Sequence, residues 1–323
     1  MTPSSKALHS SSSLIDIHVH LYENKELGNN AKTSYEIWEY GEDPNVEFAT
    51  VSGDLEDLSN TYNKGGFDRA IIVHLFDTAL ARAEARGRLS FEQTSGDISK
   101  ANLDLDLAVG EAMIASNEWI ANLGQTNPLI EVMVTVDPTV LTPKDLASHL
   151  SNLADKGIKG IKLHPVSQGY VPSDPRLAAI YDVCTNAGMI VLSHSGPGHH
   201  GGASARPSEF ASVLDQWPNL HLVLAHLGGA AWREAEDLAQ AYPQVVFDLS
   251  EIIEWEGAPN APSRKKLSTL IKNIGSDRVM LGSDFPWYDP TRTVDKVMSL
   301  PGLGSDELAA ILGGNAVNLL GLD

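Results

Sequence analysis

Two histidines separated by a single residue, His18 and His20, have the spacing of a metal-binding pair. They follow the apolar run Leu14 to Ile17, which is typical of a β-strand. In a strand the side chains of residues i and i+2 point to the same side, so both imidazoles face one way. Two neutral imidazoles placed together can chelate a divalent cation. Unrelated surface histidines would show the same spacing, so a metal site requires further ligands.

Eight short runs of aliphatic and β-branched residues, each followed by polar or glycine-rich residues and then a helical pattern, divide the chain. The runs are Ile15 to His20, Arg69 to Leu75, Leu129 to Val136, Gly157 to His164, Met189 to His194, Leu220 to His226, Val245 to Leu249 and Val279 to Asp284. Apolar i, i+3, i+4 spacing marks helices between them, as in residues 146–154, 175–187, 208–217 and 232–241. Strand then helix, repeated eight times, predicts an α/β fold, the (β/α)8 TIM barrel.

The length of the chain leaves room for insertions in one barrel. It has 323 residues, whereas a typical barrel has roughly 250. We therefore expect a single barrel domain over residues 14–323, with long insertions after strands one and two, at 21–66 and 77–125. Such insertions usually form a substrate lid or an oligomer contact. The serine-rich residues 1–13 have no apolar core and are expected to be a disordered leader.

Composition narrows the class of partner. The formal charge of −19 argues against nucleic acid or an anionic membrane as a partner, because a negative field repels both. No apolar run reaches the roughly 18 residues that a membrane-spanning helix needs. The single cysteine, Cys184, excludes an intrachain disulfide and lies in a helical pattern that predicts a buried thiol. These features favour a cytoplasmic protein that acts on a small molecule.

Polar side chains stand at the carboxyl ends of most predicted strands. A barrel brings all these ends to one rim, so the side chains converge on one mouth. They are His18 and His20 of strand one, Lys162 and His164 of strand four, His194 of strand five, His226 of strand six, Asp248, Ser250 and Glu251 of strand seven, and Asp284 of strand eight. Buried histidines without partners are costly. The set therefore favours a metal site over unrelated core histidines.

Several of these runs resemble those of the amidohydrolase superfamily. The resemblance is closest to the amidohydrolase-2 branch, which includes aminocarboxymuconate-semialdehyde decarboxylase and the pyrone-dicarboxylate lactonases. It rests on Ile15-Asp16-Ile17-His18-Val19-His20, Lys162-Leu163-His164-Pro165, Leu192 to Gly196, Leu224 to Gly229, Leu281 to Pro286 and the closing Gly314 to Leu322. These motifs extend from about Leu14 to Leu322.

The resemblance implies one divalent metal ion, usually zinc, bound by His18, His20, His194 and Asp284. Three imidazoles and a carboxylate suit Zn²⁺, and Mn²⁺ or Fe²⁺ accepts the same ligands. Asp284 would also act as a catalytic base that accepts a proton from water. Its structural alternative is a helix cap or a turn before Pro286.

Five further positions have candidate roles, some implied by the resemblance and others by their place at the strand ends. His226 resembles the strand-six histidine of the branch, a catalytic residue that polarises a substrate carbonyl or holds the attacking water. The alternative is that His226 is a second metal ligand. Lys162 matches the strand-four lysine that binuclear members carbamylate, but the branch generally holds one ion, which we expect here. Lys162 and His164 share strand parity and are predicted to bind a substrate carboxylate or phenolate. Asp248 and Glu251 would orient ligand histidines or contact substrate.

Residues in the loops after strands five and six supply weaker candidates. His199 and His200 lie in a glycine-rich loop, where they would touch substrate or be exposed. Arg206 and Arg233 would bind a substrate carboxylate or form ordinary surface ion pairs.

Three functions follow, in order of preference. The first is a metal-dependent hydrolase, in which water activated by the metal and Asp284 attacks an ester, lactone or amide carbonyl of a small organic substrate. The second is a metal-dependent non-oxidative decarboxylase of a small, for example aromatic, carboxylic acid. The third is a non-catalytic barrel that binds a ligand, which predicts loss of a metal ligand, whereas all four residues are present. The resemblance also implies a homodimer.

Overall fold

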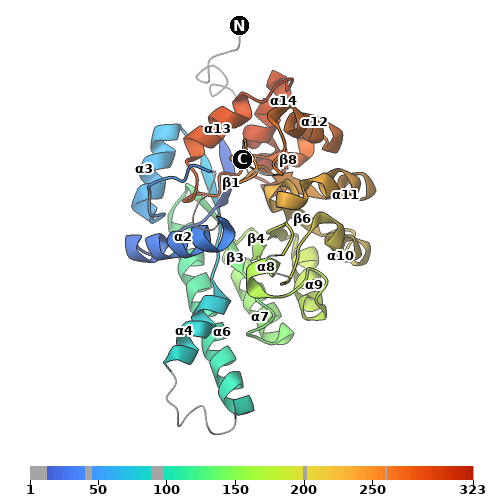
Figure 1. Ribbon diagram of the computed structural model, residues 1–323. Coiled ribbons are helices and arrows are strands. Elements are labelled where there is room, and N and C mark those ends of the chain that lie inside the picture. The colour runs from blue at the N-terminus through green and yellow to red at the C-terminus, as the bar shows by residue number, and fades with distance from the viewer. Residues whose placement is uncertain (1–12, 41–45, 89–97, 199–201, 259, 323) are drawn as a thin grey trace.

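Eight parallel strands, hydrogen-bonded in chain order, form a nearly closed barrel with helices around it (Figure 1). This computed structural model describes residues 13–40, 46–88, 98–198, 202–258 and 260–322. The predicted (β/α)8 barrel is confirmed. Residues 1–12 of the leader expected at 1–13, and the loop histidines His199 and His200, lie outside the described residues.

All eight strands fall within the predicted runs. They are β1 (Ile15–Val19), β2 (Arg69–Val73), β3 (Ile130–Thr135), β4 (Gly160–Leu163), β5 (Ile190–Ser193), β6 (His221–Leu224), β7 (Val246–Asp248) and β8 (Val279–Met280). Most end earlier than predicted, because the ladder of backbone hydrogen bonds stops before the polar residues begin. Most of the candidate site residues therefore stand just beyond the strands, on the rim of the barrel.

Helices connect the strands and fill both insertions. The α-helices are α2 (Lys25–Tyr40), α3 (Leu55–Gly65), α4 (Thr78–Gly87), α6 (Ile98–Thr126), α7 (Pro143–Ala154), α8 (Pro165–Gln168), α9 (Ala178–Ala187), α10 (Ala211–Gln216), α11 (Ala235–Ala241), α12 (Arg264–Ile274), α13 (Pro290–Met298), α14 (Ser305–Ala309) and α15 (Asn315–Leu320). Short 3-10 segments lie at Pro175–Leu177, Pro207–Phe210 and Ser276–Arg278, Ala225–Glu234 contains 3-10 turns interrupted by a kink, and a π-helical turn lies at Ala310–Gly314. The first insertion carries α2 and α3; the second carries α4 and α6, which project from the barrel (Figure 1). Within the described part of the chain, no helix is long and apolar enough to cross a membrane.

Local sequence signals account for where several helices begin and end. Asp54 caps α3 by accepting a hydrogen bond from the backbone N–H of Asp57, and Gly66 ends the helix with a left-handed φ of 73°. Thr142 caps α7 in the same way, with Pro143 as the first residue of the helix. The chain thus turns sharply enough for each helix to pack back on the sheet.

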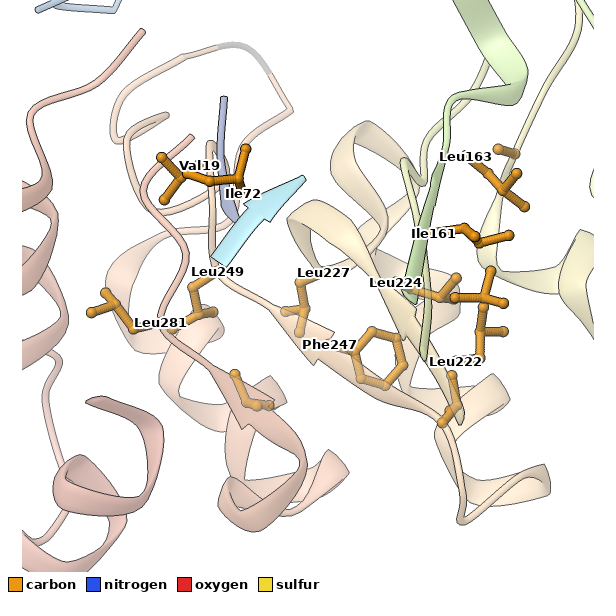
Figure 2. Close-up of a cluster of buried hydrophobic side chains, with 14 of the residues drawn as sticks. Val19, Ile72, Ile161, Leu163, Leu222, Leu224, Leu227, Phe247, Leu249 and Leu281 are labelled. Carbon is orange, nitrogen blue, oxygen red and sulfur yellow. The ribbon is translucent and has the colours of Figure 1, made fainter. Parts of the chain in front are cut away.

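Two clusters of buried apolar side chains cover the two faces of the sheet, one inside the barrel and one outside it. One, inside the strands, includes Ile17, Val73 and Leu192, and α15 adds Ala316 and Leu320 at its amino-terminal end. The other lies between strands and helices and contains the residues labelled in Figure 2. Cys184 belongs to this outer cluster and is a buried free thiol, as predicted. Apolar side chains fill the barrel interior toward the amino-terminal ends of the strands. The polar candidate residues are therefore confined to the carboxyl-terminal rim.

Candidate metal centre

The carboxyl ends of the strands surround a small cavity of about 20 Å³. Seven main candidates line it: the four predicted metal ligands (His18, His20, His194 and Asp284), the predicted catalytic residue His226, and Lys162 and His164, which were predicted to bind substrate. The lining consists of His18, His20, Tyr35, Leu75, Lys162, His164, His194, His226, Glu251, Asp284 and Trp287. The barrel therefore brings the predicted residues to one mouth.

A break in the alternation of β1 directs its histidines into this cavity. Ile17 points into the barrel core, so strict alternation would turn His18 outward. The pairing of β1 with β2 shifts register between Asp16 and Val19, and Val19 packs in the outer cluster. His18 consequently faces the same side as Ile17 and lines the cavity together with His20.

Hydrogen bonding fixes which nitrogen of His18 carries the proton. Its Nδ1 lies 2.9 Å from Oδ2 of Asp248, a carboxylate that can only accept, so Nδ1 is the donor. The lone pair is then on Nε2, which lies 3.0 Å from Nζ of Lys162 and 3.4 Å from Oδ1 of Asp284. Metal-binding histidines donate their second ring N–H to a carboxylate in this manner.

His20 and Asp284 complete a compact donor group with His18. The Nε2 atom of His20 lies 3.1 Å from Oδ1 of Asp284. One ligand atom from each of the three residues lies within 4.8 Å of the others, a spacing that a single cation can bridge. The buried Nδ1 of His20 has no hydrogen-bond partner among the described residues. Imidazole nitrogens and a carboxylate oxygen fit a borderline divalent ion such as zinc or manganese.

His194 reaches the group through His226. The Nδ1 of His226 lies 3.2 Å from the backbone carbonyl oxygen of Ser250, which accepts, so His226 Nε2 has the lone pair. That lone pair faces Nδ1 of His194 at 3.1 Å, which makes His194 Nδ1 the donor. We therefore assign the lone pair of His194 to Nε2, the form that binds metal. The compact groups of possible ligands contain His226 with Glu251 and Asp284, or with His18 and Asp248, but not His194.

Burial sets the charge of the rings. It lowers the pKa of His18 to about 3, with the nearby Lys162 ammonium adding to the effect. Burial also lowers the pKa of His20 and His226, and it holds the pKa of His164 and His194 well below the usual range. At neutral pH these rings are neutral, the state that metal coordination requires.

The acidic and basic groups respond differently to the same burial. Burial opposes ionisation of Asp284, but the hydrogen bond with His20 and the attraction of the surrounding imidazoles hold its pKa below the usual range. Asp284 is thus a carboxylate at neutral pH. Burial lowers the pKa of Lys162 to about 8, so its ammonium is still mostly protonated.

Comparison with known proteins identifies the family of the chain. The family model for amidohydrolases of the amidohydrolase-2 branch matches residues 15–322. The chain belongs to this amidohydrolase family. No curated protein matches the chain significantly.

Solved structures share the fold of this amidohydrolase at low sequence identity. An uncharacterized TIM-barrel protein from Bordetella bronchiseptica is 17% identical, with a TM-score of 0.69 and coverage of 96% of this chain and 99% of that one. A proposed 2-pyrone-4,6-dicarboxylic acid hydrolase from Pseudomonas putida is 19% identical (TM-score 0.61; 96% and 98% covered). A dihydroxybenzoic acid decarboxylase from Polaromonas, solved with manganese and the inhibitor 2-nitroresorcinol, is 14% identical (TM-score 0.63; 96% and 97% covered).

Backbone strain in the amidohydrolase is concentrated at the cavity. Among described non-glycine residues, positive φ occurs at His226 (60°), Glu251 (62°) and Asp284 (60°), and also at Leu227 and Asn260. Each such conformation costs on the order of 1–3 kcal/mol and persists only where surrounding contacts impose it. At Asp284 the backbone N–H donates to the carbonyl oxygen of His18 at 2.9 Å. These strained conformations direct the side chains of His226, Glu251 and Asp284 into the cavity.

Three cavity residues, Tyr35, Leu75 and Trp287, were not among the predicted site residues. Trp287 packs with its ring centroid 5.2 Å from that of His20 and 5.2 Å from that of Tyr35. Tyr35, on α2 of the first insertion, hydrogen-bonds Nε2 of His164. Trp287 directly follows the Phe285-Pro286 motif, which was a usable signal. Tyr35 had none, because its insertion carries no recognisable motif.

The weaker candidates have different positions in the structure. Asp248 orients His18, one of the two roles predicted for it. Arg206 pairs with Glu234, and Arg233 lies 4.3 Å above the ring of Trp232; neither arginine lines the cavity. Arg206 therefore takes the ion-pair alternative, whereas Arg233 packs on the ring of Trp232.

Proposed function

We propose that this amidohydrolase is a metal-dependent hydrolase that uses water to cleave an ester, lactone or amide of a small organic substrate. The observation that carries the proposal is the position of Asp284. Its Oδ1 lies 3.1 Å from Nε2 of His20 and 3.4 Å from Nε2 of His18, inside the cavity. A proton acceptor therefore stands beside the donor atoms that would hold the ion.

Four residues would hold one divalent ion: His18, His20, His194 and Asp284. The assigned lone pairs of His18 and His194, and the ionised state of Asp284, support this ligand set. Zinc is our first choice, with manganese or iron as alternatives, because all three accept nitrogen and oxygen donors. When bound, such an ion lowers the pKa of water and polarises a carbonyl oxygen.

Asp284 and His226 would handle the protons. Asp284 accepts a proton from the water that attacks the carbonyl carbon. His226 would donate a hydrogen bond to the developing oxyanion. Because its Nδ1–H is committed to Ser250 and its Nε2 accepts from His194 Nδ1, this role requires a second proton on Nε2 and release of the hydrogen bond with His194. Glu251, whose Oε2 lies 3.4 Å from His226 Nδ1, would stabilise that charged form.

Lys162 would bind a negatively charged oxygen of the substrate. Its side chain is buried, and its Nζ lies 3.0 Å from His18 Nε2, so the ammonium reaches the same part of the cavity as the donor atoms. A buried cation attracts an anionic group strongly because little water screens it. This supports a substrate that carries a carboxylate or phenolate.

Decarboxylation is the second candidate. It is favoured by the likeness to the manganese-containing dihydroxybenzoic acid decarboxylase, which shares the fold over 96% of this chain. In this reaction the C–C bond to the carboxylate breaks, CO₂ leaves, and Asp284 or His226 delivers a proton to the carbon that it left. The same residues serve both reactions, so the products must distinguish them.

The experiment follows the oxygen atoms. Metal-loaded protein is screened with lactones, amides and aromatic carboxylates in H₂¹⁸O, and products are analysed by mass spectrometry. The proposal expects ¹⁸O in the product, loss of turnover in Asp284→Asn, and retained turnover in Asp137→Asn, a buried carboxylate outside the cavity lining. Release of CO₂ without ¹⁸O uptake would establish the decarboxylase instead. Unchanged turnover without metal would refute both reactions.

A non-catalytic barrel remains testable in the same screen. It predicts that ligands bind but that no substrate turns over, with or without Asp284. The cytoplasmic location, the homodimer and the lack of nucleic-acid or membrane partners stay predictions from the sequence.

A further inference from the structure

We propose that a groove on the outside of the barrel, between α11 and α12, binds a small aromatic monocarboxylate. The carboxylate of this ligand lies at Lys265 and Lys266, and its ring lies on Trp232. The groove shares no lining residue with the cavity of the metal centre. It is therefore a second binding site, beyond the one to which the proposed function belongs.

The groove has room for a molecule of two fused rings. Its volume is about 410 Å³, compared with about 20 Å³ at the metal centre. Pockets that bind small molecules commonly have roughly 300 to 1,000 Å³. The two helices lie side by side (Figure 1), and Asn273 Nδ2 of α12 donates to Glu236 Oε1 of α11 at 3.1 Å. This hydrogen bond joins the two walls of the groove.

Two buried side chains supply the apolar part of the lining. They are Leu270 and Trp232, which are 5% and 8% exposed. The Nε1 atom of Trp232 donates to the carbonyl oxygen of Asn260 at 3.0 Å, which satisfies the single polar atom of this side chain and fixes its orientation. The surface that Trp232 presents to the groove is therefore apolar and suits a flat ring.

Positive charge gathers at one end of the groove. Helix α12 carries four basic residues and no acidic one, although the chain has 42 acidic and 23 basic residues. Arg264 and Lys272 each pair with a glutamate. Lys265 and Lys266 line the groove, and within the described part of the chain neither side chain has an ion pair or a hydrogen bond. Two ammonium groups without a carboxylate partner in so acidic a chain favour an anionic ligand.

The other end of the groove carries a negative charge. Glu236 lines it beside Asn273, which follows Lys266 by seven residues, so the two ends lie about 10 Å apart along α12. The Oε1 atom of Glu236 also accepts from Gln240 Nε2 at 3.3 Å. A ligand with a carboxylate at each end would bring one of them to Glu236, and like charges repel. The groove thus selects a molecule with a single carboxylate.

The first test compares the affinities of three naphthalene probes for metal-loaded protein by calorimetry. 2-Naphthoate has one carboxylate, 2-naphthol has none, and 2,6-naphthalenedicarboxylate has one at each end. We expect 2-naphthoate to bind roughly 3-fold more tightly than either of the others, the order of one exposed ionic contact. Nonspecific attraction to lysines would instead favour the dicarboxylate.

Charge variants test the two ends of the groove. Lys265→Gln combined with Lys266→Gln should weaken 2-naphthoate binding roughly 3-fold to 10-fold, because two exposed ionic contacts are lost. Lys272→Gln is the matched control, since Lys272 lies on the same helix but does not line the groove. Glu236→Gln removes the repulsion at the other end and should bring the affinity for the dicarboxylate close to that for 2-naphthoate.

NMR spectroscopy locates the bound ring. The indole N–H signal of Trp232, identified by its absence in Trp232→Phe, should shift when 2-naphthoate binds. The signal of Trp217, whose Nε1 donates to Asp182 and which does not line the groove, should stay in place. Asp284→Asn, which changes the metal centre, should bind 2-naphthoate as tightly as wild type does.

Several outcomes would overturn the proposal. They are no saturable binding of 2-naphthoate to wild type, tighter binding of the dicarboxylate, equal losses in Lys272→Gln and the double lysine variant, or an unmoved Trp232 signal. A wild-type dimer that the double lysine variant separates into monomers in sedimentation would also overturn it, because a second copy would then occupy the groove. A protein that binds 2-naphthoate as expected but no divalent ion would refute only the proposed function.

Discussion

Replacing Asp248 by asparagine should weaken metal binding, although Asp248 is not one of the four proposed ligands. Asp248 accepts hydrogen bonds from His18 Nδ1 (2.9 Å), from the backbone N–H groups of His226 and Ser250 (3.0 Å each) and from Ser250 Oγ (2.5 Å). In Asp248→Asn the amide oxygen can still accept from the two backbone groups. The amide nitrogen then faces His18 Nδ1–H, and two donors meet.

The conflict is relieved if His18 moves its proton to Nε2. That nitrogen now points an N–H at the metal position, so one of four ligands is lost until the ring is deprotonated again. Loss of an orienting carboxylate costs roughly 10-fold to 100-fold in metal affinity, which corresponds to about 1.4 to 2.8 kcal/mol. The structure places the effect in this range because His18 keeps its position in β1 and only its tautomer changes.

The assay is competition between the protein and a chelating indicator for zinc and for manganese. Asp137→Asn is the matched control, since Asp137 is buried and accepts from the backbone N–H of Thr139 at 2.7 Å but does not line the cavity. Circular dichroism shows whether each variant is folded. Metal affinity in Asp248→Asn equal to that of wild type would refute the assignment of the His18 proton.

Three further predictions concern the whole fold. Removing the ion with a chelator should lower the free energy of unfolding by about 2.7 kcal/mol, relative to protein with free metal at 100 times Kd, and an unchanged denaturation midpoint would argue against a bound ion. Burial lowers the pKa of His74 to about 3, so the unfolded chain takes up a proton below about pH 6.5 while the folded one does not. The contribution of His74 to the free energy of unfolding is therefore complete above pH 6.5 and decreases toward pH 3, by up to about 1.4 kcal/mol per pH unit. His74→Phe should reduce this dependence of the free energy of unfolding on pH, as measured by urea titrations. An identical slope in the variant would contradict this role. A Cβ atom at Gly160 would lie 1.9 Å from the carbonyl oxygen of Ile190, so Gly160→Ala should destabilise the folded chain by about 3 kcal/mol. The control Gly87→Ala should not, because a Cβ atom there would have no atom within 4 Å. Equal denaturation midpoints for the two variants would be inconsistent with this packing.

The barrel was predictable from the sequence because its signal is local and repeated. Each strand, such as β5 (Ile190–Ser193), is a short aliphatic run that ends in a polar residue, here His194. The rule that parallel strands end on one rim then placed distant residues together without any contact being known. Strand ends were predicted too late, as at β8, because apolar patterning does not show where the ladder of hydrogen bonds stops.

The details of the site depend on long-range contacts that no local pattern encodes. The proton position of His18 follows from its contact with Asp248, which lies 230 residues away in the chain. Tyr35 enters the cavity because Lys32 anchors its helix to Ala49 and Val51. Local periodicity predicts neither contact, because the first depends on how β1 and β7 face each other in the barrel and the second on how the first insertion folds.

Barrel closure and the candidate site depend on the same backbone bonds. β8 is only two residues long, and beyond it β1 is held to the last turn by Asp284 N–H to the His18 carbonyl (2.9 Å) and by His20 N–H to the Phe285 carbonyl (2.7 Å). Three of these four residues also line the cavity. An ion held by His18, His20 and Asp284 would join the two sides of this seam through their side chains. Metal binding and closure of the barrel should therefore be thermodynamically coupled, because whatever separates β1 from the end of β8 also separates the ligands.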